Sequence, residues 1–301
     1  MRINMIGAFI RNKPFGTEIA FKKGFERLGG HQITVIDPEY RDQKFDYEAD
    51  ATVLFKWMND YDFLNGLSYW EDLKKCTGKK IVYQPDDLRF PHIKKMMKEV
   101  RSFCDYAFVF DDDGVKLALE YGYKDAKKLL LTADDDIYRP IAVPKILDAV
   151  FVGSLTGGAN HESRQKMLEI IRRNRTLKIG FANDIYDVSQ ISRIYCSSKV
   201  VLNHATDVGQ PFGTGYGYQC RHFEAGFTRS AVLSNAVVND STLKNFESFS
   251  SEDELVEKLL FLVHHNEQRE EMAAAFYDEL KAAHRPEHRA QEMIEFIRSL
   301  T

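Results

Sequence analysis

"YAFVFDDDGVKLALEYG" at residues 106–122 joins a short apolar run directly to a helical pattern, and this alternation decides the fold. The apolar run at residues 106–111 predicts a buried strand, and residues 113–122 predict a helix that ends at Gly122. The aspartates at 111–113 are interpreted as the cap of this helix. Three successive carboxylates in a regular element cannot all face one metal ion, so a metal site is disfavoured here.

The same alternation extends toward the N-terminus and a short way toward the C-terminus. Residues 18–29 predict a helix, and Gly29 and Gly30 are interpreted as its C-cap. Apolar runs that predict strands lie at residues 2–9, 32–37, 51–57, 79–85 and 127–134. Short apolar runs separated by amphipathic helices imply a parallel sheet that is covered on both faces.

A second series of the same kind follows residues 136–148, which carry two prolines and are interpreted as a linker. Its expected strands are 149–154, 177–182, 200–205 and 230–236, and its expected helices are 162–174, 188–199, 221–229, 251–283 and 287–300. The sequence therefore predicts two doubly wound α/β domains with a cleft between them. In such sheets, ligands bind outside the carboxyl ends of the strands, at helix N-termini.

The composition is that of an ordinary globular protein. The chain has 301 residues, of which 44% are hydrophobic and 29% charged, and its net charge of -4 provides no global basic field for nucleic acid.

The N-terminus does not have the pattern of a secretory signal, and no apolar run approaches the ~20 residues of a membrane span. The four cysteines are widely spaced, which predicts free thiols, a reducing cytoplasmic location and no zinc site.

Two glycine-containing stretches precede candidate ligand-binding residues. Gly153 and Ser154 end a predicted strand in "FVGSLTGG" (151–158), where exposed amides favour anions, although a strand-to-helix turn needs glycine in any case. Neither a Walker loop nor GxGxxG is present. The run "GQPFGTGYGY" (209–218) precedes Arg221 and Glu224. An arginine fork suits a diphosphate, and a carboxylate can accept hydrogen bonds from ribose hydroxyls. The alternative is a surface ion pair worth only ~0.3–0.5 kcal/mol.

Carboxylates also follow a predicted strand in the first half of the chain. In "YQPDDLRFPH" (83–92), Asp86 and Asp87 are the best candidates for acceptor or catalytic contacts, because an aspartate near an acceptor hydroxyl could take its proton. Turn formation after Pro85 is an equally good explanation of these two residues. The aspartates in "ADDD" (133–136) are interpreted as an interdomain corner rather than a metal site.

The second half resembles the C-terminal domain of GT-B glycosyltransferases, in particular the CgeB-like (spore-maturation) branch of the group 1 transferases. The similar stretches cover about half of the chain in the order of the family. They are "LTADDDIYRP" (131–140), "VFVGSLTGGANHESRQKMLEII" (150–171), "IYCSSKVVLNHA" (194–205), "RHFEAGFTRSAVLS" (221–234), "SEDELVEKLLFLVHHNEQREEMA" (251–273) and "HRPEHRAQEMIEFI" (284–297).

The resemblance assigns roles to residues of this chain. The Arg-x-Phe-Glu segment of the family meets the nucleotide part of a sugar donor, and "RNKPFGTE" (11–18) resembles the loop that faces the donor. Ser198 corresponds to the serine of the family's "SK..LN" segment. The implied donor-binding residues are Gly16, Gly153, Ser154, Arg164, Asn203, Gly213, Gly215, Arg221, Phe223 and Glu224.

The expected fold is GT-B, with an acceptor domain at 1–140, a donor domain at 141–286 and a helix at 287–301 that returns to the first domain. The expected activity is sugar transfer from a nucleotide-diphosphate sugar, with a UDP-sugar as the expected donor, to a hydroxyl acceptor. Transfer is expected to retain the anomeric configuration and to need no metal or other cofactor, with Asp86 and Asp87 as catalytic residues. The acceptor stays open among a glycan, a protein, a metabolite and a hydroxylated base of phage DNA.

Two departures from the family leave alternatives open. Relatives carry a small residue and then glycine where Thr228 and Arg229 stand, so Arg229 could block the donor or add a charge toward it. The acidic residue that many retaining relatives carry in the glycine loop is absent from residues 209–218. A non-catalytic protein that binds sugar nucleotides or glycans is therefore one alternative, and a sugar-nucleotide epimerase is another.

Overall fold

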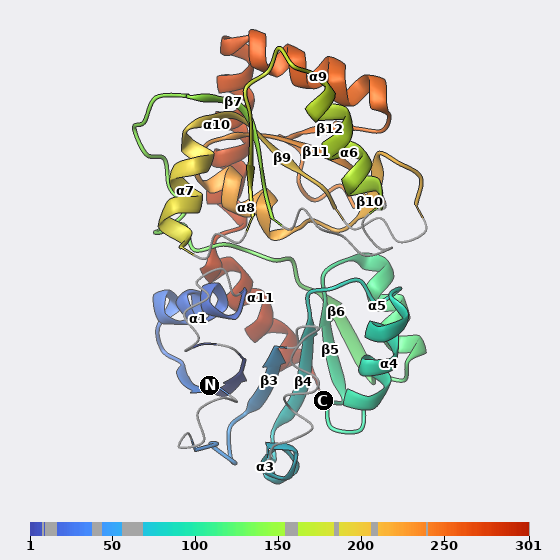
Figure 1. Ribbon diagram of the computed structural model, residues 1–301. Coiled ribbons are helices and arrows are strands. Elements are labelled where there is room, and N and C mark those ends of the chain that lie inside the picture. The colour runs from blue at the N-terminus through green and yellow to red at the C-terminus, as the bar shows by residue number, and fades with distance from the viewer. Residues whose placement is uncertain are drawn as a thin grey trace. The chain divides into compact units, whose positions relative to one another are not determined.

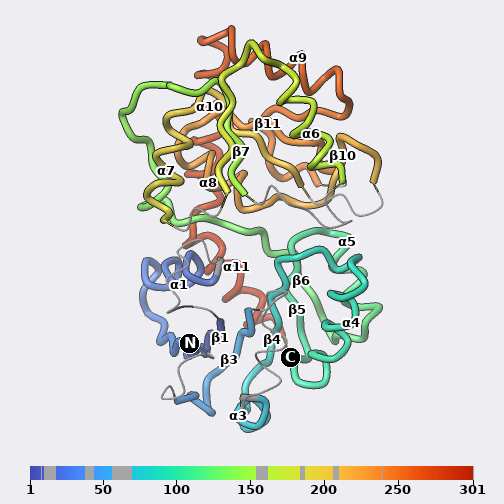
Figure 2. The backbone as a smooth tube through the Cα atoms, in the orientation of Figure 1, coloured from blue at the N-terminus to red at the C-terminus, as the bar shows by residue number. Residues whose placement is uncertain are grey.

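The structure is a computed structural model, and its chain divides into two compact units (Figure 1). Unit 1 comprises Met1–Leu131 and Pro286–Thr301, and unit 2 comprises Thr132–Arg285. The first change of unit therefore comes earlier than the boundary expected after residue 140. The colours of Figure 2 follow the chain from the first unit into the second and back. The structure describes residues 1–7, 9, 17–37, 44–55, 69–153, 162–183, 187–205, 210–238 and 240–300, with only the backbone of Thr17 and Tyr69.

Unit 1 contains a six-stranded parallel sheet with the order β2-β1-β3-β4-β5-β6, as the alternating pattern predicts. Its strands are β1 (Arg2–Ile6), β2 (Gln32–Ile36), β3 (Ala51–Phe55), β4 (Lys79–Gln84), β5 (Tyr106–Val109) and β6 (Asp125–Lys128). The strand expected at 127–134 was placed too far along the chain. Residues 129–131 are buried, but they continue beyond β6 without strand structure.

The helices of unit 1 are α1 (Thr17–Leu28), α3 (Tyr69–Lys75), α4 (Pro91–Val100), α5 (Asp112–Glu120) and α11 (Pro286–Ser299). Asp111 caps α5, and its side chain accepts a hydrogen bond from the Gly114 amide, as predicted. Gly29 and Gly30 follow α1 with φ of 63° and 70°, which agrees with a glycine C-cap. Helix α11 packs against α1 (Figure 1), so the end of the chain completes the unit that its beginning started.

Unit 2 contains a second six-stranded sheet with the order β10-β11-β9-β7-β8, in which β12 also pairs with β11 and all pairs are parallel. Its strands are β7 (Leu147–Val152), β8 (Ile179–Ala182), β9 (Ser198–Asn203), β10 (Thr214–Tyr216), β11 (Ala231–Val238) and β12 (Glu247–Phe249). Its helices are α6 (Glu162–Arg173), α7 (Val188–Cys196), α8 (Cys220–Phe227), α9 (Glu252–His264) and α10 (Asn266–Ala283). One hydrophobic core joins β7, β9 and β11 to α6 and α9.

The strand order of unit 2 reverses direction between β7 and β9. The chain passes from β7 to β8 on one side of the sheet, and it then continues with β9 on the other side of β7. In doubly wound sheets, the carboxyl ends of the strands at such a reversal form the usual ligand site. A functional site is therefore expected at the residues directly after β7 and at the end of β9.

No helix among the described residues is long and apolar enough to cross a membrane. The four cysteines are free thiols, as predicted; Cys76, Cys104 and Cys196 are buried, and Cys220 is half-buried.

Candidate active site

Gly153 follows β7 at the strand reversal and has a φ of 137°, a backbone conformation that L side chains rarely adopt. A Cβ at this position would overlap Nη2 of Arg221 and would lie 2.8 Å from its Cζ. Arg221 is the second residue of α8, and its Nε donates a hydrogen bond to the Val152 carbonyl. The absence of a side chain at Gly153 therefore creates the space in which the Arg221 guanidinium lies.

A second arginine lies near the same point of the sheet. The Cζ of Arg221 is 5.3 Å from the centre of the Phe151 ring, and the Cζ of Arg164, from α6, is 5.9 Å from it. Two guanidinium groups near one aromatic ring concentrate positive charge at this point of the sheet. With the Gly153 backbone they form a group suited to a diphosphate, because arginine forks match phosphate oxygens. Phe151 was not predicted as part of this group.

A buried polar network holds the first turn of α8. His222 is fully enclosed, and its Nδ1 accepts a hydrogen bond from the Gln219 amide at 3.1 Å. The amide nitrogen of Asn203, at the end of β9, lies 3.1 Å from the same ring nitrogen and 3.2 Å from the Ser234 hydroxyl. Burial is the main reason that the pKa of His222 falls to about 3. The network therefore fixes the helix turn that carries Arg221.

Asn203 and Phe223, both expected at the donor, have their described contacts within unit 2. Asn203 is fully buried with its amide on His222 and Ser234, and Phe223 is fully buried near the ring of His284, with 6.2 Å between the ring centres. Both residues thus support α8 from inside. These interior contacts do not account for a role at the donor, so the assignment of Asn203 and Phe223 as donor contacts stays a prediction.

Glu224 lies one turn further along α8 and is buried, with 8% of its surface exposed. Its Oε2 accepts a hydrogen bond from the Tyr195 hydroxyl at 3.0 Å. Burial raises the pKa of Glu224, whereas Arg221, Tyr195 and Tyr138 act in the opposite direction. The surface ion pair considered as an alternative is therefore wrong for Glu224, because this carboxylate is inside unit 2 and is held by a tyrosine.

The remaining expected donor residues have different surroundings. Gly213 has a φ of 90°, and a Cβ there would lie 2.7 Å from the Ser250 Cα. The close packing of this loop against the backbone at Ser250 therefore requires glycine at this position. Gly215 lies in β10 and pairs with Val237 of β11. Gly16 and Ser154 lie outside the described residues. The structure thus brings Gly153, Arg164 and Arg221 together near Phe151, places Glu224 one turn after Arg221 in α8, and gives Gly213 a structural role.

Arg229 lies at the other end of α8 from Arg221 and is exposed. Its φ is 56°, its amide bonds to the Gly226 carbonyl, and the Ser230 amide bonds to the Ala225 carbonyl at 3.1 Å. This is the Schellman pattern, which normally places glycine at the left-handed position. The left-handed backbone conformation thus explains why relatives carry glycine at this position. Blocking the donor or adding a charge toward it, the two roles considered for Arg229, does not fit this position.

Replacing Arg229 with glycine is expected to raise the free energy of unfolding by about 1 kcal/mol, because glycine adopts the left-handed conformation without steric cost. Chemical denaturation measures this difference. Arg229→Ala is the matched control, since alanine removes the charge and keeps the strain. Equal stability of the glycine and alanine variants would contradict the backbone explanation.

Asp86 and Asp87 follow β4 at the carboxyl edge of the unit 1 sheet, but they differ in their partners. Asp87 Oδ1 accepts hydrogen bonds from the Arg89 amide at 2.9 Å and from Arg89 Nη1 at 2.7 Å, and Arg89 also pairs with Asp111. The Asp86 amide donates to the Gln84 side chain, while its carboxylate accepts no hydrogen bond from the part of the chain that the structure describes. Burial, and then the neighbouring Asp87, raise the pKa of Asp86 to about 6.

These surroundings separate the two aspartates chemically. A carboxylate with a pKa near neutrality is suited to accept a proton from a hydroxyl, whereas one held by an arginine is suited to hold a loop in place. Asp86 therefore fits the expected acceptor contact better than Asp87 does. Arg89, which links the ends of β4 and β5 through Asp87 and Asp111, was not predicted.

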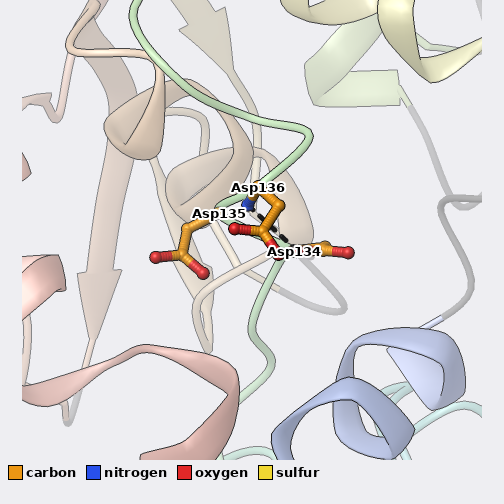
Figure 3. A group of neighbouring side chains, drawn as sticks. All are labelled: Asp134, Asp135 and Asp136. Carbon is orange, nitrogen blue, oxygen red and sulfur yellow. Dashed lines mark hydrogen bonds between the residues drawn. The ribbon is translucent and has the colours of Figure 1, made fainter. Parts of the chain in front are cut away.

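The aspartates at 134–136 form a turn at the start of unit 2 (Figure 3). Oxygens of the three side chains lie within 4.8 Å of one another, which is close enough for a shared cation. However, Asp135 Oδ2 accepts hydrogen bonds from Lys281 Nζ at 2.9 Å and Arg285 Nε at 3.0 Å. Asp134 Oδ1 accepts one from the Asp136 amide at 3.0 Å. The group thus fastens the beginning of unit 2 to the end of α10, in agreement with a corner.

Residues 164–295, less than half of the chain, match a family model described as glycosyl transferase-like. No curated protein matches the chain by sequence. An alpha-glucosyltransferase in complex with UDP and a 13-mer DNA containing a central A:G mismatch is similar in structure, with a TM-score of 0.66 and 12% identity over 99% of this chain and 100% of that chain.

Two further solved structures are similar along most of the chain. Anabaena HepE in complex with UDP has a TM-score of 0.60 and 11% identity over 100% of both chains. An alpha,alpha-trehalose-phosphate synthase (UDP-forming) from Burkholderia vietnamiensis has a TM-score of 0.56 and 8% identity over 85% of this chain and 74% of that chain. The two Rossmann-like units with parallel sheets thus form the GT-B fold of glycosyltransferase structures, as predicted.

Proposed function

We propose that the protein is a glycosyltransferase that binds a UDP-sugar in unit 2 and transfers the sugar to a hydroxyl acceptor. The observation that carries this proposal is the group formed by Arg221, Arg164 and the Gly153 backbone at the strand reversal of unit 2. Two similar structures of the same fold contain UDP, and the match to the glycosyl transferase-like family model, at residues 164–295, covers most of unit 2. The assignment to the CgeB-like branch is part of this proposal.

The two arginines supply positive charge where a diphosphate leaving group develops negative charge. Fixed cations and helix ends stabilise such a leaving group without a divalent ion, so we infer that the reaction needs no metal or other cofactor. Glu224, in the next turn of α8, is inferred to accept hydrogen bonds from the ribose hydroxyls. The free cysteines support a cytoplasmic location.

Unit 1 is inferred to bind the acceptor at the carboxyl end of β4, where Asp86 accepts a hydrogen bond from the reacting hydroxyl. Retention of the anomeric configuration is part of the proposal and rests on the family resemblance. The acceptor is a hydroxyl of a glycan, a protein, a metabolite or a modified DNA base. The DNA in one similar structure supports including the last of these.

The first test is the binding of UDP by calorimetry, with and without EDTA. Arg221→Ala is expected to weaken UDP binding roughly tenfold to hundredfold, because it removes charge-assisted hydrogen bonds to the diphosphate. Chelation of metals is expected to leave the dissociation constant unchanged.

Arg172→Ala is the matched control for this measurement. Arg172 comes from α6, like Arg164, and its Cζ lies 4.5 Å from the ring centre of Phe181. The Arg172→Ala variant therefore removes an arginine that lies beside an aromatic ring away from the strand reversal. Wild-type protein that binds no UDP, or an Arg221 variant that binds it as tightly as wild type, would remove the proposed donor site.

Asp86→Asn is expected to lower the slow hydrolysis of a bound UDP-sugar, in which water takes the place of the acceptor, by roughly 10²-fold without changing UDP affinity. Because the pKa of Asp86 is raised to about 6, the wild-type rate should fall as the pH drops below that value and the carboxylate becomes protonated. Rates of UDP release between pH 5 and pH 8, with Asp105→Asn as an exposed control in the same unit, measure this dependence. If the rate of the Asp86 variant still falls at acidic pH as the wild-type rate does, the pH dependence belongs to another group.

A further inference from the structure

A buried tyrosine holds the Glu224 carboxylate, and a second buried tyrosine lies beside the first. Tyr195 from α7 is fully buried and donates its hydroxyl to Glu224 Oε2 at 3.0 Å. Tyr138 is 2% exposed, and the centre of its ring lies 6.5 Å from that of Tyr195. Burial and the neighbouring Glu224 carboxylate raise the pKa of both tyrosines, so both phenols are neutral hydrogen-bond donors at physiological pH.

Each tyrosine comes from a part of unit 2 that is itself fixed. The hydroxyl of Ser230, at the end of α8, donates to the Tyr195 carbonyl at 3.1 Å. The Tyr138 amide donates to the Asp134 carbonyl at 2.9 Å, in the turn that Asp135 fastens to Lys281 and Arg285. The aspartate turn therefore fixes the segment that places the Tyr138 ring beside Tyr195.

These contacts restrict the Glu224 carboxylate. A carboxylate has two oxygens with about four lone-pair sites, and a donor on one oxygen restricts the rotation of the whole group. Recognition of a vicinal pair of hydroxyls needs such a restriction, because a freely rotating carboxylate loses entropy on binding.

We propose that Tyr195 is a positioning residue that orients Glu224 for recognition of the ribose hydroxyls, and that the neighbouring ring of Tyr138 supports it. This inference rests on the proposed UDP-sugar site. It assigns to the site a preference for ribonucleoside diphosphates over their deoxy analogues, and it places the origin of that preference in tyrosines that act through Glu224 and do not contact the ligand.

The test compares UDP with 2′,3′-dideoxy-UDP by calorimetry. Wild-type protein is expected to bind UDP roughly tenfold to hundredfold more tightly than the analogue, which lacks both hydroxyls. Tyr195→Phe keeps the ring and removes only the hydroxyl. It is expected to weaken UDP binding roughly fivefold and to leave the affinity for the analogue unchanged, so that the ratio of the two affinities falls. Tyr138→Phe is expected to lower the same ratio.

Tyr123→Phe is the control, because the Tyr123 hydroxyl is also buried and donates to the Met97 carbonyl at 2.8 Å, but in unit 1. It should cost similar stability and leave both affinities unchanged. A folded Tyr195 variant with the wild-type affinity ratio would overturn the positioning role while leaving the UDP site intact. Wild-type protein that binds neither nucleotide would overturn the proposed function itself.

A pH series provides a second readout that a purely structural role would not move. The groups that face Glu224 are Arg221 from its own helix, Tyr195 from α7 and Tyr138 from the segment before β7, and all three oppose the effect of burial on its pKa. Removal of the Tyr195 hydroxyl should raise this pKa further. UDP binding by the variant should therefore weaken at a higher pH than in wild type as the solution is acidified, and coincident profiles would count against the proposal.

Discussion

Replacing Gly153 with alanine is expected to weaken UDP binding roughly tenfold to hundredfold and to lower the free energy of unfolding by about 1–3 kcal/mol. The loss of stability comes from the φ of 137°, which alanine adopts only with strain. The loss of binding has a different cause, because the new Cβ would overlap the end of the Arg221 side chain. A flexible arginine can move aside at little cost, but it then leaves the Val152 carbonyl and the Phe151 ring. Calorimetry and chemical denaturation measure the two effects separately.

Gly29→Ala is the matched control for this prediction. Gly29 also has a positive φ, 63°, but a Cβ there would meet nothing within 4 Å. This variant should lose about 1 kcal/mol of stability and no affinity for UDP. If Gly153→Ala binds UDP as tightly as Gly29→Ala does, then the placement of Arg221 does not depend on the missing side chain.

The second large effect is expected from acid, through His222. The pKa of this histidine falls from 6.5 to about 3 in the folded protein because the ring is buried. The unfolded chain therefore binds a proton near pH 6.5 that the folded protein does not bind. The associated stability is fully present above pH 6.5 and is lost as the pH falls toward 3. The loss amounts to about 1.4 kcal/mol per pH unit, or about 2 kcal/mol at pH 5.

His222→Gln tests this contribution, since glutamine carries polar groups that do not titrate. The variant should be less stable than wild type at pH 7.5, because it disturbs the contacts with Gln219 and Asn203, but the difference should shrink by about 2 kcal/mol at pH 5. Denaturant unfolding at the two pH values gives the difference of differences, in which other titrating groups cancel. A stability gap that stays constant between them would mean that His222 is protonated in the folded protein or neutral in both states.

The two parallel sheets were predictable because most strands and the helices that follow them have their own local patterns in the sequence. Apolar runs of five or six residues and helical spacing gave most elements of both units. The errors are physical in origin. Residues 129–131 are apolar because they are buried, but burial does not require strand pairing, so the strand predicted there ends early. Helix α4 was missed although Ile93, Met97 and Val100 follow helical spacing, and β10 and β12 are too short to leave a pattern.

Gly153 and Arg221 were assigned to the site because their separate segments resemble motifs of the family. That the two residues share one space, with Gly153 leaving room for the Arg221 guanidinium, was not predicted from either segment. The direction of a side chain was not predictable in the same way: Asn203 and Phe223 belong to suitable segments, but they contact the interior. Tyr195 left no signal because it meets Glu224 only after folding, across 29 positions of sequence. Neither composition nor periodicity records such a pair.

The two ends of the chain combine in unit 1, and this has a consequence for biosynthesis. A ribosome releases residues 1–131 long before it has made α11, yet Phe296 of α11 packs against Phe108 at 4.9 Å and Glu287 pairs with Arg27 at 3.0 Å. Unit 2 is continuous in sequence, so its last helix, α10, precedes α11 along the chain. Because α11 leaves the ribosome after α10, we expect unit 2 to complete its fold before unit 1 does. Until α11 has emerged, the nascent first unit has an uncovered apolar face that chaperones can bind.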